Sequence, residues 1–152
     1  WSGAVIRAAI TIEIAADLVI REELEVNRKL DADFVESLLV WAHGSHEKFT
    51  RIILPLLKNS ERFAALKKIQ EHIFYVDEER NSVVHSGITK QRRTAERVLA
   101  LSREIIEALV RKYHGQFELR GIKVSSEKAA PKRKKRANQQ FTLFSADLSS
   151  NR

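Results

Sequence analysis

The chain has 152 residues and is 43% hydrophobic, with two Pro, five Gly and neither Cys nor Met. This length suits one domain with a single apolar core, and the lack of Cys excludes disulfides, thiolate metal sites and Cys nucleophiles. The few Gly and Pro residues favour long helices over a turn-rich β-sandwich or barrel. No segment reaches the roughly 18 uninterrupted apolar residues of a membrane span, and the N-terminus does not resemble a signal peptide. Because the sequence opens at Trp1 without a Met, we expect a fragment of a longer protein.

The net charge of +7 is concentrated near the C-terminus. Residues 123–152 contain eight Lys or Arg and two acidic residues, a net charge of +6, whereas residues 1–122 contain 19 basic and 18 acidic residues. We therefore expect a folded domain over 1–122 and a disordered basic tail over 123–152. The basic run 131–136 predicts nonspecific RNA affinity, a nuclear-import address in a eukaryotic source, or a linker to a further domain. The apolar patch 141–144 suits docking onto a partner.

The first half of the chain predicts three helices. Residues 4–26 are apolar nearly all the way round a helix and too long for a strand, which predicts a central helix. A second helix is expected over 31–44, with Trp41 in the core. A third begins at Ser45, whose hydroxyl is placed to cap it, and Pro55 should kink it or end it early.

The second half predicts two longer helices. One runs from a cap at Ser60 to Gly87, where glycine can adopt the left-handed cap conformation. The next spans 89–114, and residues 116–124 suit a short strand. The fold expected is an all-α, up-and-down bundle of four to five helices with a short C-terminal extension.

A single charged residue breaks the apolar stripe of the fourth helix. Arg80 stands where the heptad-like spacing calls for a hydrophobic side chain. A guanidinium facing a core or an interface is costly unless an anion meets it, either a carboxylate of the protein or a phosphate of a ligand. Asn81 and His85 share a helix face, so the amide can orient the imidazole. Arg80 and His85 lie about 140° apart round a regular helix, and they converge only through side-chain reach, a helix end or a second subunit.

These residues resemble the signature of the HEPN superfamily, in which Arg and a polar residue precede a His after four to six intervening positions. Here Arg80, Asn81 and His85 match it, followed by a small residue and Gly87, and the likeness extends to helix order over residues 4–114. The resemblance implies a homodimer that unites two motifs in one cleft through the motif-bearing helices. It also implies a metal-independent endoribonuclease that needs no cofactor, of the toxin or defence type, with an antitoxin or an additional domain as a further partner.

The residue types fit that chemistry. His85 is the candidate general acid or base, because imidazole titrates near neutral pH. Arg80 would stabilise charge at the phosphate with its bidentate fork, and Asn81 would position His85 or the phosphate. The products would carry 2′,3′-cyclic phosphates. The alternative is a catalytically inactive HEPN-like module that dimerises and binds RNA, nucleotide or protein, in which Arg80 is a buried structural partner.

Two further groups of charged residues are candidates for the site. Glu13 and Asp17 share a face of the first helix, as a solvated stripe or as partners of a neighbouring helix, and a sharper hypothesis makes Glu13 the internal partner of Arg80. Lys90, Arg92 and Arg93 follow the motif. They either contact an RNA backbone or form the exposed face at the start of the fifth helix.

The cluster His43, Ser45, His46 and Glu47 has no spacing of a helical metal-ligand pair, so we interpret it as a helix–helix turn with polar caps and predict no metal. The localisation expected is cytoplasmic, or nuclear if the protein is eukaryotic and residues 131–136 serve as an import signal.

Overall fold

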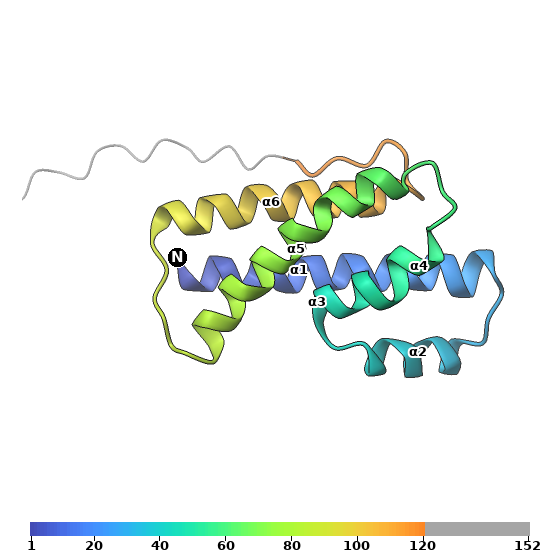
Figure 1. Ribbon diagram of the computed structural model, residues 1–152, viewed down its shortest axis with the longest axis horizontal. Helices are drawn as coiled ribbons and strands as arrows, with labels where there is room; N and C mark the ends of the chain where they lie inside the picture. Colours follow the sequence, from blue (N-terminus) through green and yellow to red (C-terminus); the bar gives the residue numbers. More distant parts are fainter. Residues whose placement is uncertain (121–152) are drawn as a thin grey trace, which may run out of the picture. The chain divides into compact units, whose positions relative to one another are not determined.

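The computed structural model describes residues 1–120, which form an all-α helical bundle (Figure 1). The predictions for residues 123–152, including the basic run and the apolar patch, lie outside the described residues. Helix α1 (Ser2–Arg21) is the centre of the bundle and contacts α2, α3, α5 and α6. Its buried side chains are spread along its whole length, as the apolar run predicts: Val5, Ala8, Ala9, Ile12, Ala15, Ala16, Val19 and Ile20.

The chain leaves α1 through a π-helical turn, η1 (Glu22–Asn27), and returns along α2 (Ala32–Trp41). The carboxylate of Asp31 caps α2 by accepting hydrogen bonds from the backbone N–H groups of Asp33 and Phe34. The predicted burial of Trp41 is wrong. Its side chain is 55% exposed, with the Arg51 guanidinium 5.2 Å from the ring centroid, because α2 turns only Val35 and Leu39 fully into the core.

A continuous helical segment then runs through α3 (Gly44–Glu47), the π-helical η2 (Lys48–Ile53) and α4 (Leu54–Leu56). It ends one residue after Pro55, as predicted. Proline has no backbone N–H to donate to the preceding helical turn. The expected cap at Ser45 is wrong, since His43 occupies the N-cap position and Ser45 already lies inside the first turn.

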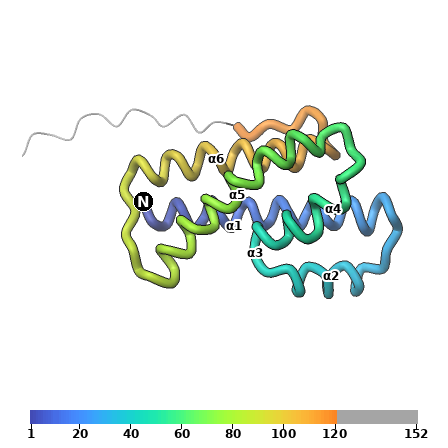
Figure 2. The backbone as a smooth tube through the Cα atoms, viewed as in Figure 1, coloured from blue at the N-terminus to red at the C-terminus, as the bar shows by residue number. Residues whose placement is uncertain are grey.

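Two long helices complete the bundle, α5 (Phe63–Val84) and α6 (Arg92–Val110). Both contact α1 and each other, and α5 crosses the other two (Figure 2). The predicted stop at Gly87 is confirmed, because this residue has a φ of +63° and its N–H donates to the Val83 carbonyl at 3.2 Å. Ser60 does not cap α5, whose N-cap is Arg62.

The strand predicted over 116–124 is not formed in its described part, residues 116–120. Side chains of α6 hold this backbone instead. Arg111 Nε donates to the Phe117 carbonyl at 2.7 Å, and the Leu119 N–H donates to Glu107 Oε1 at 3.2 Å. Backbone groups with these partners need no strand to pair with.

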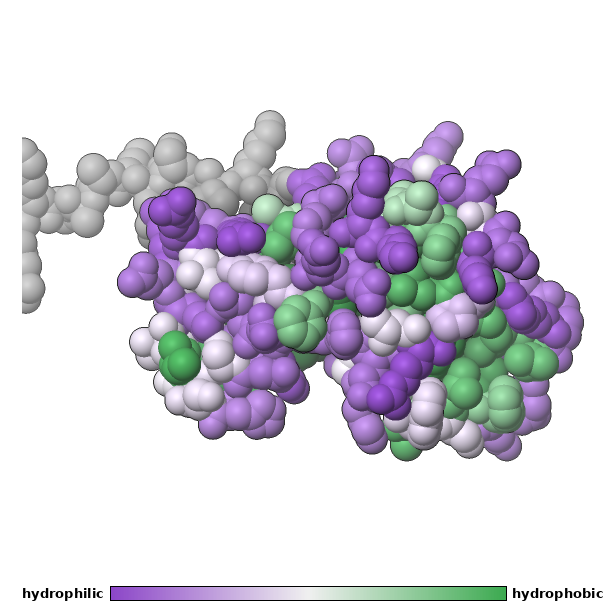
Figure 3. Space-filling model, in the orientation of Figure 1, coloured by the Kyte–Doolittle hydropathy of each residue, from purple (hydrophilic) through white to green (hydrophobic). Residues whose placement is uncertain are grey.

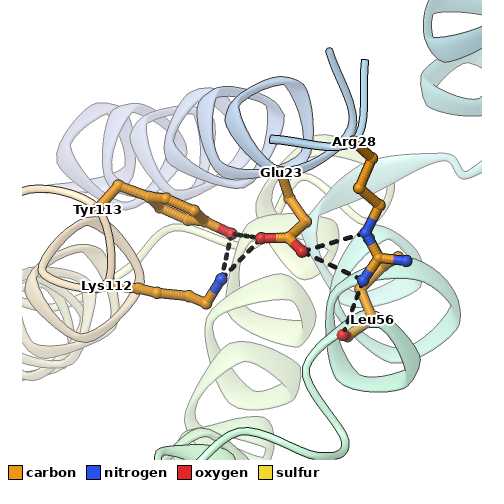
Figure 4. Close-up of polar contacts among 5 residues, drawn as sticks. All are labelled: Glu23, Arg28, Leu56, Lys112 and Tyr113. Carbon is orange, nitrogen blue, oxygen red and sulfur yellow. Dashed lines mark hydrogen bonds and ion pairs between the residues drawn. The ribbon is translucent and has the colours of Figure 1, made fainter. Parts of the chain in front are cut away.

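A polar cluster ties the end of α1 to the end of α6 (Figure 4). Glu23, in η1, accepts hydrogen bonds from Lys112 Nζ and Tyr113 Oη at 2.7 Å each, and from Arg28 at 3.1 and 3.2 Å. Burial alone would raise the pKa of the Glu23 carboxyl, but these three donors outweigh burial and lower the pKa to about 2. Burial and the Glu23 carboxylate raise the pKa of Tyr113, so its hydroxyl stays a donor at neutral pH.

We expect Glu23→Gln to lower the melting temperature at pH 7, because the amide loses the charge that three donors share. A carboxyl whose pKa falls on folding adds stability above its unfolded pKa of about 4.5 and loses it as the pH drops toward 2. The gap between wild type and Glu23→Gln should therefore close between about pH 5 and pH 2 in thermal melts. Glu22→Gln is the matched control, as Glu22 forms no ion pair within residues 1–120; a gap independent of pH would contradict this assignment.

Candidate functional site

A pocket of about 300 Å³ lies where α1, the turn into α3 and the C-terminal half of α5 meet. Figure 3 shows this face hollowed between the end of α5 and the α2–α3 region. The pocket brings two of the three motif residues, Arg80 and Asn81, together with residues from two other helical segments. Its lining residues are Ala9, Ile10, Glu13, His43, Gly44, Ser45, Asp77, Arg80 and Asn81.

Asp77 fixes the wall that α3 contributes. Its Oδ1 accepts a hydrogen bond from Ser45 Oγ at 2.7 Å, and its Oδ2 accepts one from the His46 N–H at 2.9 Å. Both carboxylate oxygens are therefore engaged, and the buried Ser45 hydroxyl is satisfied. Because Asp77 lies one turn before Arg80 and Asn81 on α5, the same two hydrogen bonds set the distance between α3 and the motif face.

Glu13 is held by Lys48 and not by Arg80, so the hypothesis that it is the internal partner of Arg80 is wrong. Lys48 is only 5% exposed, and its ammonium lies 3.0 Å from Glu13 Oε1 and 2.7 Å from Asp17 Oδ1. Burial alone would lower the pKa of Lys48, but hydrogen bonds to Asp17 and Glu13 raise it. Glu13 and Asp17 are therefore partners of a neighbouring helical segment, as one of the two alternatives from the sequence proposed.

Arg80 is half-buried and bonds to its neighbour on α5. Its Nη1 donates to Asn81 Oδ1 at 2.8 Å, and it forms no ion pair with a carboxylate within residues 1–120. The amide of Asn81 thus orients the guanidinium instead of the His85 imidazole that the sequence suggested. With its oxygen engaged, the Asn81 side chain leaves its NH₂ group as a donor.

His85 lies apart from the pocket. It is exposed and forms the C-cap of α5, with φ −97° and ψ −30°, and its N–H donates to the Asn81 carbonyl at 2.8 Å. The helix keeps its regular geometry up to this residue, so the angle of about 140° between positions 80 and 85 persists. A single chain therefore presents Arg80 and His85 on different faces of the same helix end.

The three basic residues after the motif are not equally accessible to RNA. Lys90 Nζ lies 2.5 Å from Glu79 Oε2, and both side chains are largely buried, so the expected RNA contact at Lys90 is corrected to a structural ion pair. Its backbone N–H donates to Ser2 Oγ, which fastens the α5–α6 loop to α1. Arg92 is exposed and pairs with Glu96 at 2.7 Å, and Arg93 is exposed. Only the last two lie at the surface, where a phosphate can reach them.

Sequence reasoning missed two residues of the pocket, His43 and Asp77. Asp77 had a signal, because it stands three and four residues before Arg80 and Asn81 and so shares their helix face. His43 had none, since its place beside α5 depends on how α3 packs across the bundle. No group of three or more side chains suited to hold a metal ion occurs within residues 1–120.

We expect Asp77→Ala to destabilise the fold by about 1–3 kcal/mol, because it leaves the buried Ser45 hydroxyl and the His46 N–H without their acceptor. Ser45→Ala should cost less, and the double variant should cost less than the sum of the two, since they share one hydrogen bond. Chemical denaturation of the three variants measures this coupling. Glu78→Gln, at the exposed neighbouring position, is the control. Strictly additive losses of stability would contradict the hydrogen bond between Asp77 and Ser45.

Comparison with known proteins yields no match for this chain among protein-family models, curated proteins or solved structures. Within residues 1–120, none of the helices combines the length and apolar character that crossing a bilayer demands.

Proposed function

We propose that this protein is a HEPN-type, metal-independent endoribonuclease that acts as a homodimer. The observation that carries the proposal is the state of Arg80. Its guanidinium lies in a pocket, oriented by Asn81, without a carboxylate to neutralise it within residues 1–120. A half-buried cation in this condition suits a phosphate better than a structural role.

A homodimer can bring His85 of one chain close to Arg80 of the other. Because Arg80 and His85 lie on different faces of α5, a phosphate held by Arg80 would meet the imidazole of a second chain. Exposed apolar side chains flank both residues and favour such an association. Ile10, at the pocket, is 47% exposed; beside His85, Val84 and Ile88 are 47% and 50% exposed.

The chemistry follows from the pairing of two motifs in one cleft. One imidazole takes the proton of the ribose 2′-hydroxyl, and the 2′ oxygen forms a bond to phosphorus. The bond between phosphorus and the 5′ oxygen breaks, and that oxygen takes a proton from water. Arg80 stabilises the charge that builds on the phosphate oxygens. The products are a 2′,3′-cyclic phosphate and a 5′-hydroxyl.

The alternative, an inactive binding module with Arg80 as a buried structural partner, is disfavoured by the same contacts. In that case a carboxylate should meet Arg80, yet its side-chain partner within residues 1–120 is the amide of Asn81. We further propose that the enzyme is a toxin or defence effector of the cytoplasm, restrained by an antitoxin or an additional domain. Arg92 and Arg93, at the start of α6, would contact the RNA backbone.

The test is incubation of the purified chain with cellular RNA in excess EDTA, beside Arg80→Ala and His85→Ala. We expect wild type alone to cleave, leaving cyclic-phosphate ends, and each variant to lose at least about 100-fold in rate. Both variants should keep the wild-type melting temperature, because neither side chain forms an ion pair within residues 1–120.

His114→Ala is the matched control, since His114 is an exposed histidine in another part of the bundle. Cleavage that persists in both motif variants would reveal a contaminating nuclease. A lower melting temperature in Arg80→Ala, with no cleavage by wild type, would favour the binding module instead.

A further inference from the structure

The motif pocket offers hydrogen-bonding groups that phosphate chemistry does not use. Asp77 has both oxygens engaged by Ser45 and His46, so it contributes shape more than bonding capacity. Glu13 is different: Lys48 meets its Oε1, and its Oε2 has no hydrogen-bond partner within residues 1–120. Asn81, which also lines the pocket, turns its oxygen to Arg80 and keeps its NH₂ group as a donor.

A carboxylate acceptor and an amide donor that line the same small pocket match one RNA base best. Guanine carries two adjacent donors, N1–H and N2–H₂, which a carboxylate accepts together, and beside them O6 is an acceptor for an amide. Adenine, cytosine and uracil lack the pair of adjacent donors. The apolar wall of Ala9 and Ile10 suits the face of a ring, and a volume of about 300 Å³ is at the small end for ligand sites, which fits a single nucleotide.

We propose that this pocket binds a guanine base beside the phosphate that Arg80 holds, with Glu13 as the residue that selects it. Glu13 accepts from N1–H and N2–H₂ through Oε2 and the second lone pair of Oε1, and Asn81 donates to O6. His43 lines the same pocket. This inference rests on the proposed function for its substrate class, RNA. It adds base preference, which neither the motif nor its spacing specifies.

Glu13 has a matched control one helical turn away. Glu13 and Asp17 each accept one bond from the Lys48 ammonium and are about equally exposed, at 40% and 36%, but only Glu13 lines the pocket. Glu13→Gln and Asp17→Asn therefore remove the same kind of partner from Lys48. If Glu13 has a purely structural role, the two substitutions should change nucleotide binding equally. If Glu13 selects the base, only Glu13→Gln should change the preference for guanosine.

The experiment is calorimetric titration of the full chain with the 3′-monophosphates of guanosine, adenosine, cytidine and uridine. We expect the guanosine compound to bind at least about tenfold more tightly than the others. Glu13→Gln should abolish that preference, Asp17→Asn should keep it within about twofold, and thermal melts should show similar stability losses for both variants.

Three results would overturn the proposal: no preference among the four nucleotides, a preference that survives in Glu13→Gln, or a guanosine preference that is lost equally in Glu13→Gln and Asp17→Asn. Its failure is separable from failure of the proposed function. RNA cleavage without a base preference would leave the nuclease standing and remove guanine selection. A Glu13-dependent guanosine preference in a chain that cleaves no RNA would support the pocket and remove the catalysis.

Discussion

The buried ammonium group of Lys48 fixes how the bundle is assembled around its site. A buried cation must meet its counter-charges at hydrogen-bonding distance, or the cost of burial is not offset. Because both carboxylates stand on α1, the contact locks the register between η2 and the central helix. That register carries Gly44 and Ser45 to the side of α5, where Asp77 receives the Ser45 hydroxyl. The pocket is the space that these two fastenings leave open.

The same arrangement separates residues that hold structure from residues that remain free to act. Ion pairs within the bundle engage Lys48, Lys90 and Glu79. Asp77 accepts a hydrogen bond from Ser45. Of the other charged residues that line the pocket, Glu13 meets the Lys48 ammonium, whereas Arg80 bonds to the side-chain amide of Asn81. His85 is exposed at the end of the helix. Because Arg80 lines the pocket and forms no ion pair within residues 1–120, we propose that an anion binds there.

The helices could be predicted from the sequence because they depend on local signals. The apolar run of α1, the heptad-like stripe of α5 and the left-handed cap at Gly87 each specify their element within a few residues. The partners of Glu13 and Lys90 could not be predicted, since both depend on register across the bundle. The exposure of Trp41 and the failed strand at 116–120 share this cause: tertiary contacts, not local pattern, decide which face is covered and whether an extended segment is paired.

We propose that Arg80 of one chain acts together with His85 of another. Mixing the two single variants tests it directly, because a dimer of Arg80→Ala with His85→Ala still contains one intact guanidinium and one intact imidazole on different chains. We expect the inactive Arg80→Ala and His85→Ala preparations to regain measurable RNA cleavage when they are mixed and their subunits have exchanged. If the mixture stays inactive although the subunits demonstrably exchange, the two residues do not cooperate across an interface and the composite site is contradicted.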